Sequence, residues 1–162
     1  MSASESKDAA AEPVVTLQPE KIRLSSTVPP DGREELEEVF FFNPKQPLVR
    51  RRVMEHIEHY GPPEIVQQGD GITLALRGID RAQTIFLTCG NGRGQLLAAV
   101  IYIRQDHRLK VLYLAIKHGI DRSTCYTLLL YVVRSLIRLG RQIKGIQFLD
   151  LCIGPRDAVF KV

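Results

Sequence analysis

Residues 108–151 read RLKVLYLAIKHGIDRSTCYTLLLYVVRSLIRLGRQIKGIQFLDL, and this stretch decides the fold. Its beginning, 109–117, alternates and is rich in β-branched and aromatic residues, which predicts a strand. A helix is expected from Ser123 or Thr124 onward, because apolar residues follow at the spacing of one helical stripe, at positions 125, 128, 129, 132, 133, 136, 137 and 143. The apolar run 146–153 predicts a short strand buried on both faces. The stretch therefore indicates a strand-helix-strand crossover, with a candidate anion site where the helix begins.

The part of the chain before this stretch predicts mainly antiparallel strands and two helices. A first strand is expected at 22–25, a helix from Asp31 to Asn43, and a second helix at 48–59 that ends in Tyr60-Gly61-Pro62-Pro63. Strands are expected at 72–77, 83–88 and 95–104. The run Gly90-Asn91-Gly92-Arg93-Gly94 is followed by a strand pattern, which favours a hairpin turn over a phosphate-binding loop. The predicted fold class is α/β (α+β), with a mixed central sheet in which a mostly antiparallel meander precedes the crossover.

The composition indicates one domain of modest size. The 162 residues are 44% hydrophobic and carry a net charge of +4, which allows a single core and mildly favours anionic partners. Residues 1–13 show no periodicity and are predicted to form a disordered tail, which leaves 14–162 as the domain. Cys89, Cys125 and Cys152 are widely spaced in apolar surroundings, which favours reduced thiols and a cytoplasmic location. No apolar run has the length of a membrane span.

The end of the strand and the start of the helix carry a family resemblance. The matching residues are Leu114, Ala115, Ile116, Arg122 and Leu130. They resemble the pattern Leu-Ala-Val-x-Pro followed by Arg/Gln-x-x-Gly-x-Gly/Ala of the GCN-related N-acetyltransferase (GNAT) superfamily. Ser123, Cys125 and Thr127 replace the expected glycines, and each adds a Cβ. The chain therefore resembles a degenerate or truncated member of that superfamily.

The resemblance implies an N-acetyltransferase that moves an acyl group from acetyl-CoA, or another acyl-CoA, to an amine of a small molecule or a protein. The main-chain edge of the strand would pair with the pantetheine arm, and the main chain at the helix start would hold the pyrophosphate. The implied cofactor-binding residues are Leu114, Ala115, Ile116, Arg122, Ser123, Thr124, Cys125, Tyr126 and Thr127. Candidate proton donors are Tyr113 and Tyr126, and candidate bases are His107 and His118.

Whether the chain is an enzyme stays open at this point. If Asp121 or Ser123 merely caps the helix and Arg122 is solvated, the chain would be a non-catalytic GNAT-like module that binds an anion or a protein. The stripe of Arg134, Arg138 and Arg141 is interpreted as a solvent-exposed face, because no aromatic residues interleave with it as in nucleic-acid binding proteins. Nucleic acid is therefore not an expected partner.

Two further interpretations concern metals and assembly. His56 and His59 lie three residues apart on a predicted helix, as half of a metal site would, but a solvated helix face is favoured because further ligands at suitable spacing are missing. No metal is therefore predicted. The short segment after the last predicted strand is expected to leave that strand with an open edge, which a homodimer would cover.

Overall fold

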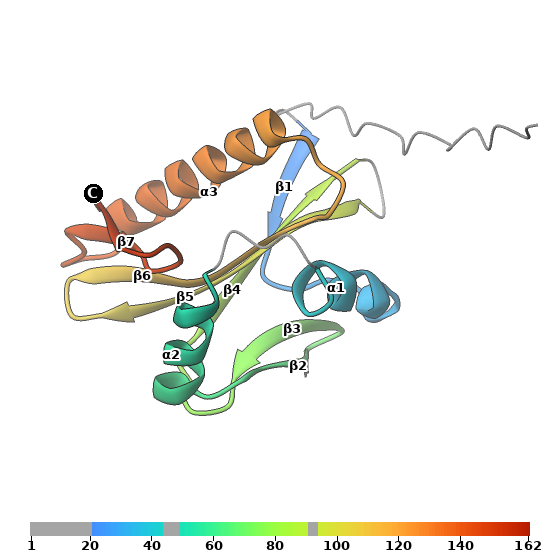
Figure 1. Cartoon of the computed structure of the whole chain (residues 1–162), viewed down its shortest axis with the longest axis horizontal. Helices are drawn as coiled ribbons and strands as arrows, with labels where there is room; N and C mark the ends of the chain where they lie inside the picture. The colour runs from blue at the N-terminus through green and yellow to red at the C-terminus, as the bar shows by residue number, and fades with distance from the viewer. Residues whose placement is uncertain (1–20, 44–48, 91–93) are drawn as a thin grey trace, which may run out of the picture.

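The computed structural model describes residues 21–43, 49–90 and 94–162 of the chain, and a six-stranded mixed sheet runs through them (Figure 1). In spatial order the strands are β1 (Ile22–Ser25), β4 (Gln83–Cys89), β5 (Gln95–Gln105), β6 (Arg108–Ile116), β7 (Phe148–Leu151) and β8 (Ala158–Lys161). β6 and β7 are parallel, and all other neighbours in this sheet are antiparallel. The fold class predicted from the sequence is therefore confirmed, with the crossover where residues 108–151 placed it.

Other elements cover both faces of this sheet (Figure 1). α3 (Arg122–Gln142) crosses from β6 to β7 on one face and buries Leu128, Val132 and Leu136 against the strands. The other face carries a short 3₁₀ helix (Pro30–Gly32), α1 (Arg33–Phe40), α2 (Arg50–Tyr60) and the hairpin of β2 (Pro63–Gln68) and β3 (Gly71–Leu76). β5 and most of β6 are buried on both faces, which explains their nearly continuous apolar sequence.

Two strands have no counterpart among the elements predicted from the sequence. β2 follows Pro62 directly and ends in the exposed residues Gln67 and Gln68, so it shows no apolar alternation. β8 has four residues, of which only Phe160 is half-buried. β8 pairs antiparallel with β7. The prediction that the last crossover strand leaves an open edge is therefore wrong, because the chain itself covers that edge.

Some predictions fall partly or wholly on residues outside the described ranges. The predicted tail, 1–13, lies outside them, as do residues 91–93 of the predicted hairpin turn. β4 and β5 are nevertheless adjacent antiparallel partners, which confirms the hairpin. Among the described residues, every helix is too short or too polar to cross a membrane.

Candidate functional site

β6 and β7 separate part of the way along the sheet. Their parallel pairing covers only Arg108 to Val111 of β6, and a last main-chain bond joins the Cys152 N–H to the Val111 carbonyl at 2.9 Å. β6 then continues to Ile116 with β5 as its strand partner. The end of β6 therefore has one paired edge and one edge that faces a gap within the sheet, here called the β6–β7 gap.

An extra residue in β6 marks the point where the gap opens. Val111 pairs with Tyr102 of β5. The next pair joins Tyr113 to Ile101, so Leu112 has no residue opposite it. A bulge of this kind bends a strand and increases its twist. The bend coincides with the last pairing between β6 and β7.

Alternation along β6 decides which main-chain groups face the gap. The N–H of Lys117 bonds to the Leu97 carbonyl of β5 at 2.8 Å. The main-chain groups of successive strand residues point to opposite edges of the strand. Because those of Lys117 point to β5, those of Ile116 point to the gap, and so do those of Leu114 two residues earlier. Asn43 supports this direction, because its Nδ2 donates to the Ile116 carbonyl at 2.5 Å. Leu114 has no strand partner on that edge among the described residues, and its N–H and C=O face the gap.

The start of α3 follows the end of β6 across the loop 117–121. Asp121 is the N-cap, and its Oδ2 accepts a hydrogen bond from the Thr124 N–H at 3.2 Å. Hydrogen bonds from Thr124 lower the pKa of Asp121, so this exposed carboxyl is ionised at neutral pH. Ser123 instead accepts, through its carbonyl, a bond from the Thr127 hydroxyl at 3.1 Å. Of the two capping residues considered from the sequence, the structure therefore selects Asp121.

The residues expected to bind a cofactor form two neighbouring groups. Leu114, Ala115 and Ile116 are buried at the end of β6. The first turns of α3 carry the exposed Arg122, Ser123, Tyr126 and Thr127 and the half-buried Thr124 and Cys125. Because the side chains of the first group are buried, only its main chain can reach a ligand in the gap. Burial also raises the pKa of the Cys125 thiol, which keeps it protonated at neutral pH.

A cavity of about 380 Å³ adjoins the end of β6 on the face that carries α1 and α2. Its lining is Phe40, Phe41, Asn43, Val53, Ile57, Pro62, Pro63, Tyr113, Leu114 and Ala115. Two larger hollows, of about 510 and 500 Å³, border β1 and β4 and include neither the end of β6 nor the start of α3. Of these three hollows, the smaller cavity is the one that adjoins the β6–β7 gap and can serve a ligand bound there.

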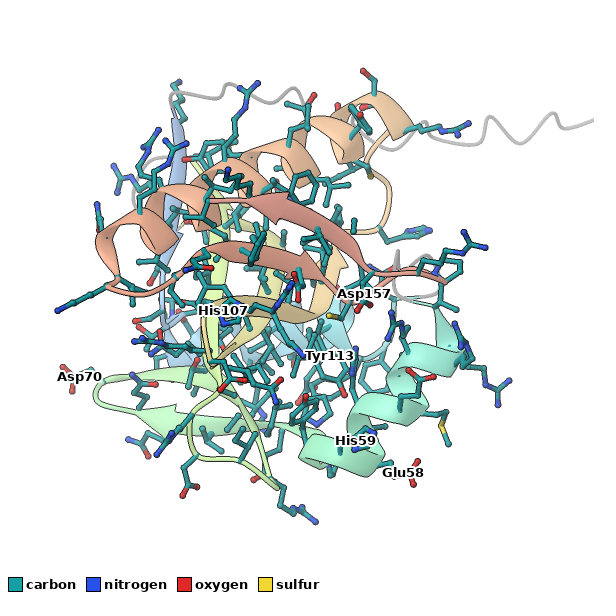
Figure 2. All side chains as sticks on the ribbon, turned by 90° about the vertical axis from the view of Figure 1, so that its left-hand side faces the viewer. Glu58, His59, Asp70, His107, Tyr113 and Asp157 are labelled. Atoms are coloured by element: carbon teal, nitrogen blue, oxygen red, sulfur yellow. The ribbon has the colours of Figure 1, made fainter. Side chains whose placement is uncertain are left out.

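Tyr113 lines this cavity and has an unusual environment. Its side chain is 3% exposed, and its hydroxyl has no hydrogen-bond partner among the described residues. The ring lies between the sheet and α2 (Figure 2), with ring centroids 5.5 Å from His56 and 5.9 Å from Phe40. Burial raises the pKa of Tyr113 to about 12. A buried hydroxyl without a partner is rare in folded proteins, and this one can donate to a ligand in the cavity.

His56 is buried behind Tyr113, which corrects the expectation of a solvated helix face. Its Nε2 lies 2.8 Å from the Cys152 carbonyl. A carbonyl can only accept, so Nε2 carries the proton and Nδ1 is the unprotonated nitrogen. Burial lowers the pKa of His56, against the opposing effect of this hydrogen bond. His59, by contrast, is exposed on the outer side of α2 (Figure 2).

The other candidate catalytic residues lie outside this cavity. Tyr126 is 64% exposed on α3, and His118 is exposed in the loop before α3. His107 lies in the turn between β5 and β6 (Figure 2), beside Phe148, at the opposite end of β6 from the gap. Of the four residues considered for proton transfer, Tyr113 alone lines the cavity.

α2 fixes the segment that follows β7. The Val49 N–H before α2 bonds to the Ile153 carbonyl at 2.9 Å, and Arg52 Nε donates to the Gly154 carbonyl at 3.0 Å. Arg52 also pairs with Asp157, which lies in the connection between β7 and β8 (Figure 2). These contacts hold the chain after Leu151 against α2, away from the end of β6. The hydrogen bonds that Asn43, His56 and Arg52 make were not predicted from the sequence. Each of these side chains bonds to a main-chain carbonyl more than 70 residues further along the chain.

The buried His56 predicts a component of acid sensitivity. The pKa of His56 is lowered in the folded state from the ordinary value of 6.5. As the pH falls below 6.5, the unfolded chain therefore binds more protons than the folded chain, and the free energy of unfolding decreases. We expect His56→Gln to remove this component, because glutamine can still donate to the Cys152 carbonyl without titrating. Urea unfolding at about pH 7.5 and pH 5.5 measures the loss in each protein.

His59→Gln is the matched control on the same helix, since His59 is exposed. It should lose as much stability on acidification as the unmodified protein. Equal losses in all three proteins would show that His56 takes up its proton as readily in the folded chain as in the unfolded one.

Comparisons with known proteins are sparse. No family model matches the sequence, and no curated protein matches it. Among solved structures, the crystal structure of a nourseothricin acetyltransferase aligns with 81% of this chain and 72% of its own, at 17% sequence identity and a TM-score of 0.40. At this distance the alignment transfers no activity, and the function has to be inferred from the site itself.

Proposed function

We propose that this chain transfers an acyl group from acetyl-CoA, or another acyl-CoA, to an amine. The observation that carries the proposal is the main chain of Leu114, which faces the β6–β7 gap and has no strand partner there within 21–43, 49–90 and 94–162. The apolar cavity adjoins this edge on one side, and the start of α3 follows the end of the strand. The arrangement suits a ligand that has an extended arm and a charged end.

The chain's own groups fit such a ligand along its arm. The pantetheine arm contains amides, which can pair with the N–H and C=O of Leu114 as a neighbouring strand would. The first turn of α3 has N–H groups without helical partners and a partial positive charge, which suit an anionic end. The Asp121 carboxylate opposes this second interaction, because it already accepts from Thr124.

Tyr113 is the residue to which we assign a role in the chemistry. Acyl-CoA supplies a thioester, and the amine attacks its carbonyl carbon, so that a C–N bond forms while the C–S bond breaks. With a pKa of about 12, the Tyr113 hydroxyl stays protonated at neutral pH and can donate to the negative charge that develops. The strand edge and the cavity would contribute proximity and orientation.

Binding without catalysis is a second candidate function, favoured by two observations. The Asp121 carboxylate occupies the place where the helix start would hold a phosphate. Arg134 and Arg138 line a groove of about 390 Å³ with Tyr131, between α3 and the β1 side of the sheet. A basic groove of this kind suits an acidic protein partner.

A homodimer and a cytoplasmic location also stay predictions. The free cysteines are compatible with a cytoplasmic location.

Removing the charge of Asp121 tests the primary proposal. Asparagine caps helices about as well as aspartate, so Asp121→Asn should leave α3 intact. We expect it to tighten the binding of acetyl-CoA roughly fivefold at low salt, because a like charge no longer faces the phosphates. Ser123→Glu, which adds a charge to the same turn, should weaken binding at least roughly tenfold. Isothermal titration calorimetry with acetyl-CoA and CoA measures both.

Gln105→Glu controls for the negative charge that Ser123→Glu adds, because Gln105 is exposed at the far end of β5. It should bind acetyl-CoA like the unmodified protein. If none of the proteins releases heat or gains thermal stability at millimolar CoA, the acyltransferase proposal fails, and the basic groove on α3 becomes the surface to test.

A further inference from the structure

Among the described residues, the lining of the cavity beside Tyr113 carries no charged side chain. Its described residues are aromatic, aliphatic and proline side chains, with the amide of Asn43 and the hydroxyl of Tyr113 as the polar groups. Asn43 already donates to the carbonyls of Val39 and Ile116. Tyr113 is thus the lining residue with an unused buried donor. The sequence between Asn43 and Val49 contains one titratable residue, Lys45, and no Asp, Glu or His.

Acidic side chains on the surrounding elements are committed elsewhere. Ion pairs join Glu37 to Arg33, Glu55 to Arg51 and Arg52, Glu64 to Arg77, and Asp157 to Arg52. Glu35 accepts from the Leu96 N–H at 2.7 Å. Glu34, Glu38 and Glu58 are exposed, and Glu58 points away from the sheet (Figure 2). In the described part of the chain, no carboxylate is therefore placed to hold an ammonium ion in the cavity or to take its proton.

Four titratable groups that pack near the cavity in the described part of the chain are uncharged at neutral pH. His56 packs behind Tyr113 and has a lowered pKa because it is buried. Burial likewise raises the pKa of Tyr60, Tyr113 and Cys152, so these residues keep their protons. The positive charge of Arg52 contributes to the lowered pKa of His56, and it would repel a cationic ligand rather than attract one. An ammonium group would lose its hydration here without gaining a carboxylate partner from the described lining residues.

This chemistry selects among amines, given that the proposed acyl transfer is correct. An alkylamine is an ammonium ion at neutral pH and must lose a proton before it can attack a thioester. An arylamine is uncharged at neutral pH, because its nitrogen lone pair is delocalised into the ring. Its ring also matches a cavity walled by Phe40, Phe41 and Tyr113. We propose that the acyl acceptor is a weakly basic, apolar amine of the arylamine class, bound with its ring in this cavity and its amino group toward Leu114.

The transfer then needs no general base before attack. The amine nitrogen bonds to the thioester carbonyl carbon, the C–S bond breaks, and the thiolate leaves with the electron pair. The nitrogen, now bearing excess positive charge, releases its proton to the thiolate or to water. Tyr113 contributes a hydrogen bond throughout and keeps its own proton. Atoms and charges balance without a further reactant.

The isomers p-toluidine and benzylamine test the proposal, because they differ only in whether the nitrogen is attached to the ring. With acetyl-CoA present at neutral pH, we expect kcat/KM for p-toluidine to exceed that for benzylamine at least roughly tenfold. The p-toluidine rate should be nearly constant between about pH 6 and pH 9, whereas the benzylamine rate should rise up to about tenfold per pH unit as the ammonium ion loses its proton.

A cavity-filling variant locates the acceptor. Val53→Phe adds bulk to a half-buried lining residue of α2, and it should raise KM for p-toluidine while leaving the dissociation constant of acetyl-CoA unchanged. Met54→Phe makes a comparable change at the next position, which is 62% exposed, and should leave both unchanged. Titration of acetyl-CoA without an acceptor measures cofactor binding alone. A failure of the proposed acyl transfer can therefore be told apart from a failure of the arylamine inference.

If acetyl-CoA binds and benzylamine is the better acceptor, the arylamine inference is overturned while acyl transfer stands. The same holds if Val53→Phe leaves KM for p-toluidine unaltered. If acetyl-CoA does not bind at all, the proposed function fails and the acceptor class falls with it.

Discussion

Tyr113→Phe is expected to stabilise the fold and to slow acyl transfer. The hydroxyl is buried without a partner among the described residues, so its removal abolishes a desolvation cost and should raise the free energy of unfolding by about 1 kcal/mol. The same change removes the donor that we assign to the reacting thioester, and kcat should fall by about 100-fold. Denaturant unfolding and steady-state kinetics on one preparation measure the two effects.

Tyr102→Phe is the matched control within the same sheet. Tyr102 is 6% exposed on β5, but its hydroxyl donates to Gln83 Oε1 at 3.0 Å. Removal of this hydroxyl should lower the free energy of unfolding by about 1 kcal/mol and leave kcat unchanged. If Tyr113→Phe also destabilised the protein, its hydroxyl would have a partner in solution, and the reason to assign it to a ligand would disappear.

Arg108→Ala is expected to destabilise the protein by about 3 kcal/mol. Arg108 begins β6, and its guanidinium lies 2.8 Å from the Asp150 carboxylate of β7 and 4.5 Å from the Phe148 ring centroid. Asp150 is 4% exposed, so truncation of Arg108 leaves a carboxylate buried without its cation. The value is at the low end of the range for such pairs, because the Arg108 side chain is itself 33% exposed. Urea unfolding measures the loss.

A second substitution separates the charge from the packing of Arg108. Asp150→Asn in the Arg108→Ala background removes the stranded charge and should recover part of the lost stability. Arg77→Ala breaks a more exposed ion pair with Glu64 and should cost less than about 1 kcal/mol. A loss equally small for Arg108→Ala would mean that Asp150 is hydrated in solution, and that the parallel pairing of β6 and β7 does not depend on this pair.

The crossover was predictable from the sequence because its signals are long and periodic. α3 repeats its apolar stripe over 21 residues, and β5 and β6 are apolar because both of their faces are covered. β2 and β8 were missed for the opposite reason, since short strands at the surface bury too little to impose a pattern. The helix cap at Asp121 was among the alternatives considered, because capping is a local property of the chain.

The surroundings of the gap were not predictable in the same way. The local sequence predicts that Asn43 ends a helix before Pro44, and that His56 is a solvated helix residue. Their partners, the carbonyls of Ile116 and Cys152, lie 73 and 96 residues further along the chain. Contacts at such separation leave no periodic trace in a single sequence, and they become visible only when the packing of α1 and α2 on the sheet is known.

The alternation of side chains between the two faces of β6 shifts by one residue at the unpaired Leu112. Before Leu112 the odd-numbered Val111 packs in the layer of α3, whereas after it the even-numbered Leu114 does. Tyr113 is thereby placed in the opposite layer, with α1 and α2. A chain one residue shorter at this point would turn the tyrosine toward α3 and exchange the faces of every later side chain in the strand. The position of the Tyr113 hydroxyl beside the cavity therefore depends on the number of residues that precede it in β6 as well as on the tyrosine itself.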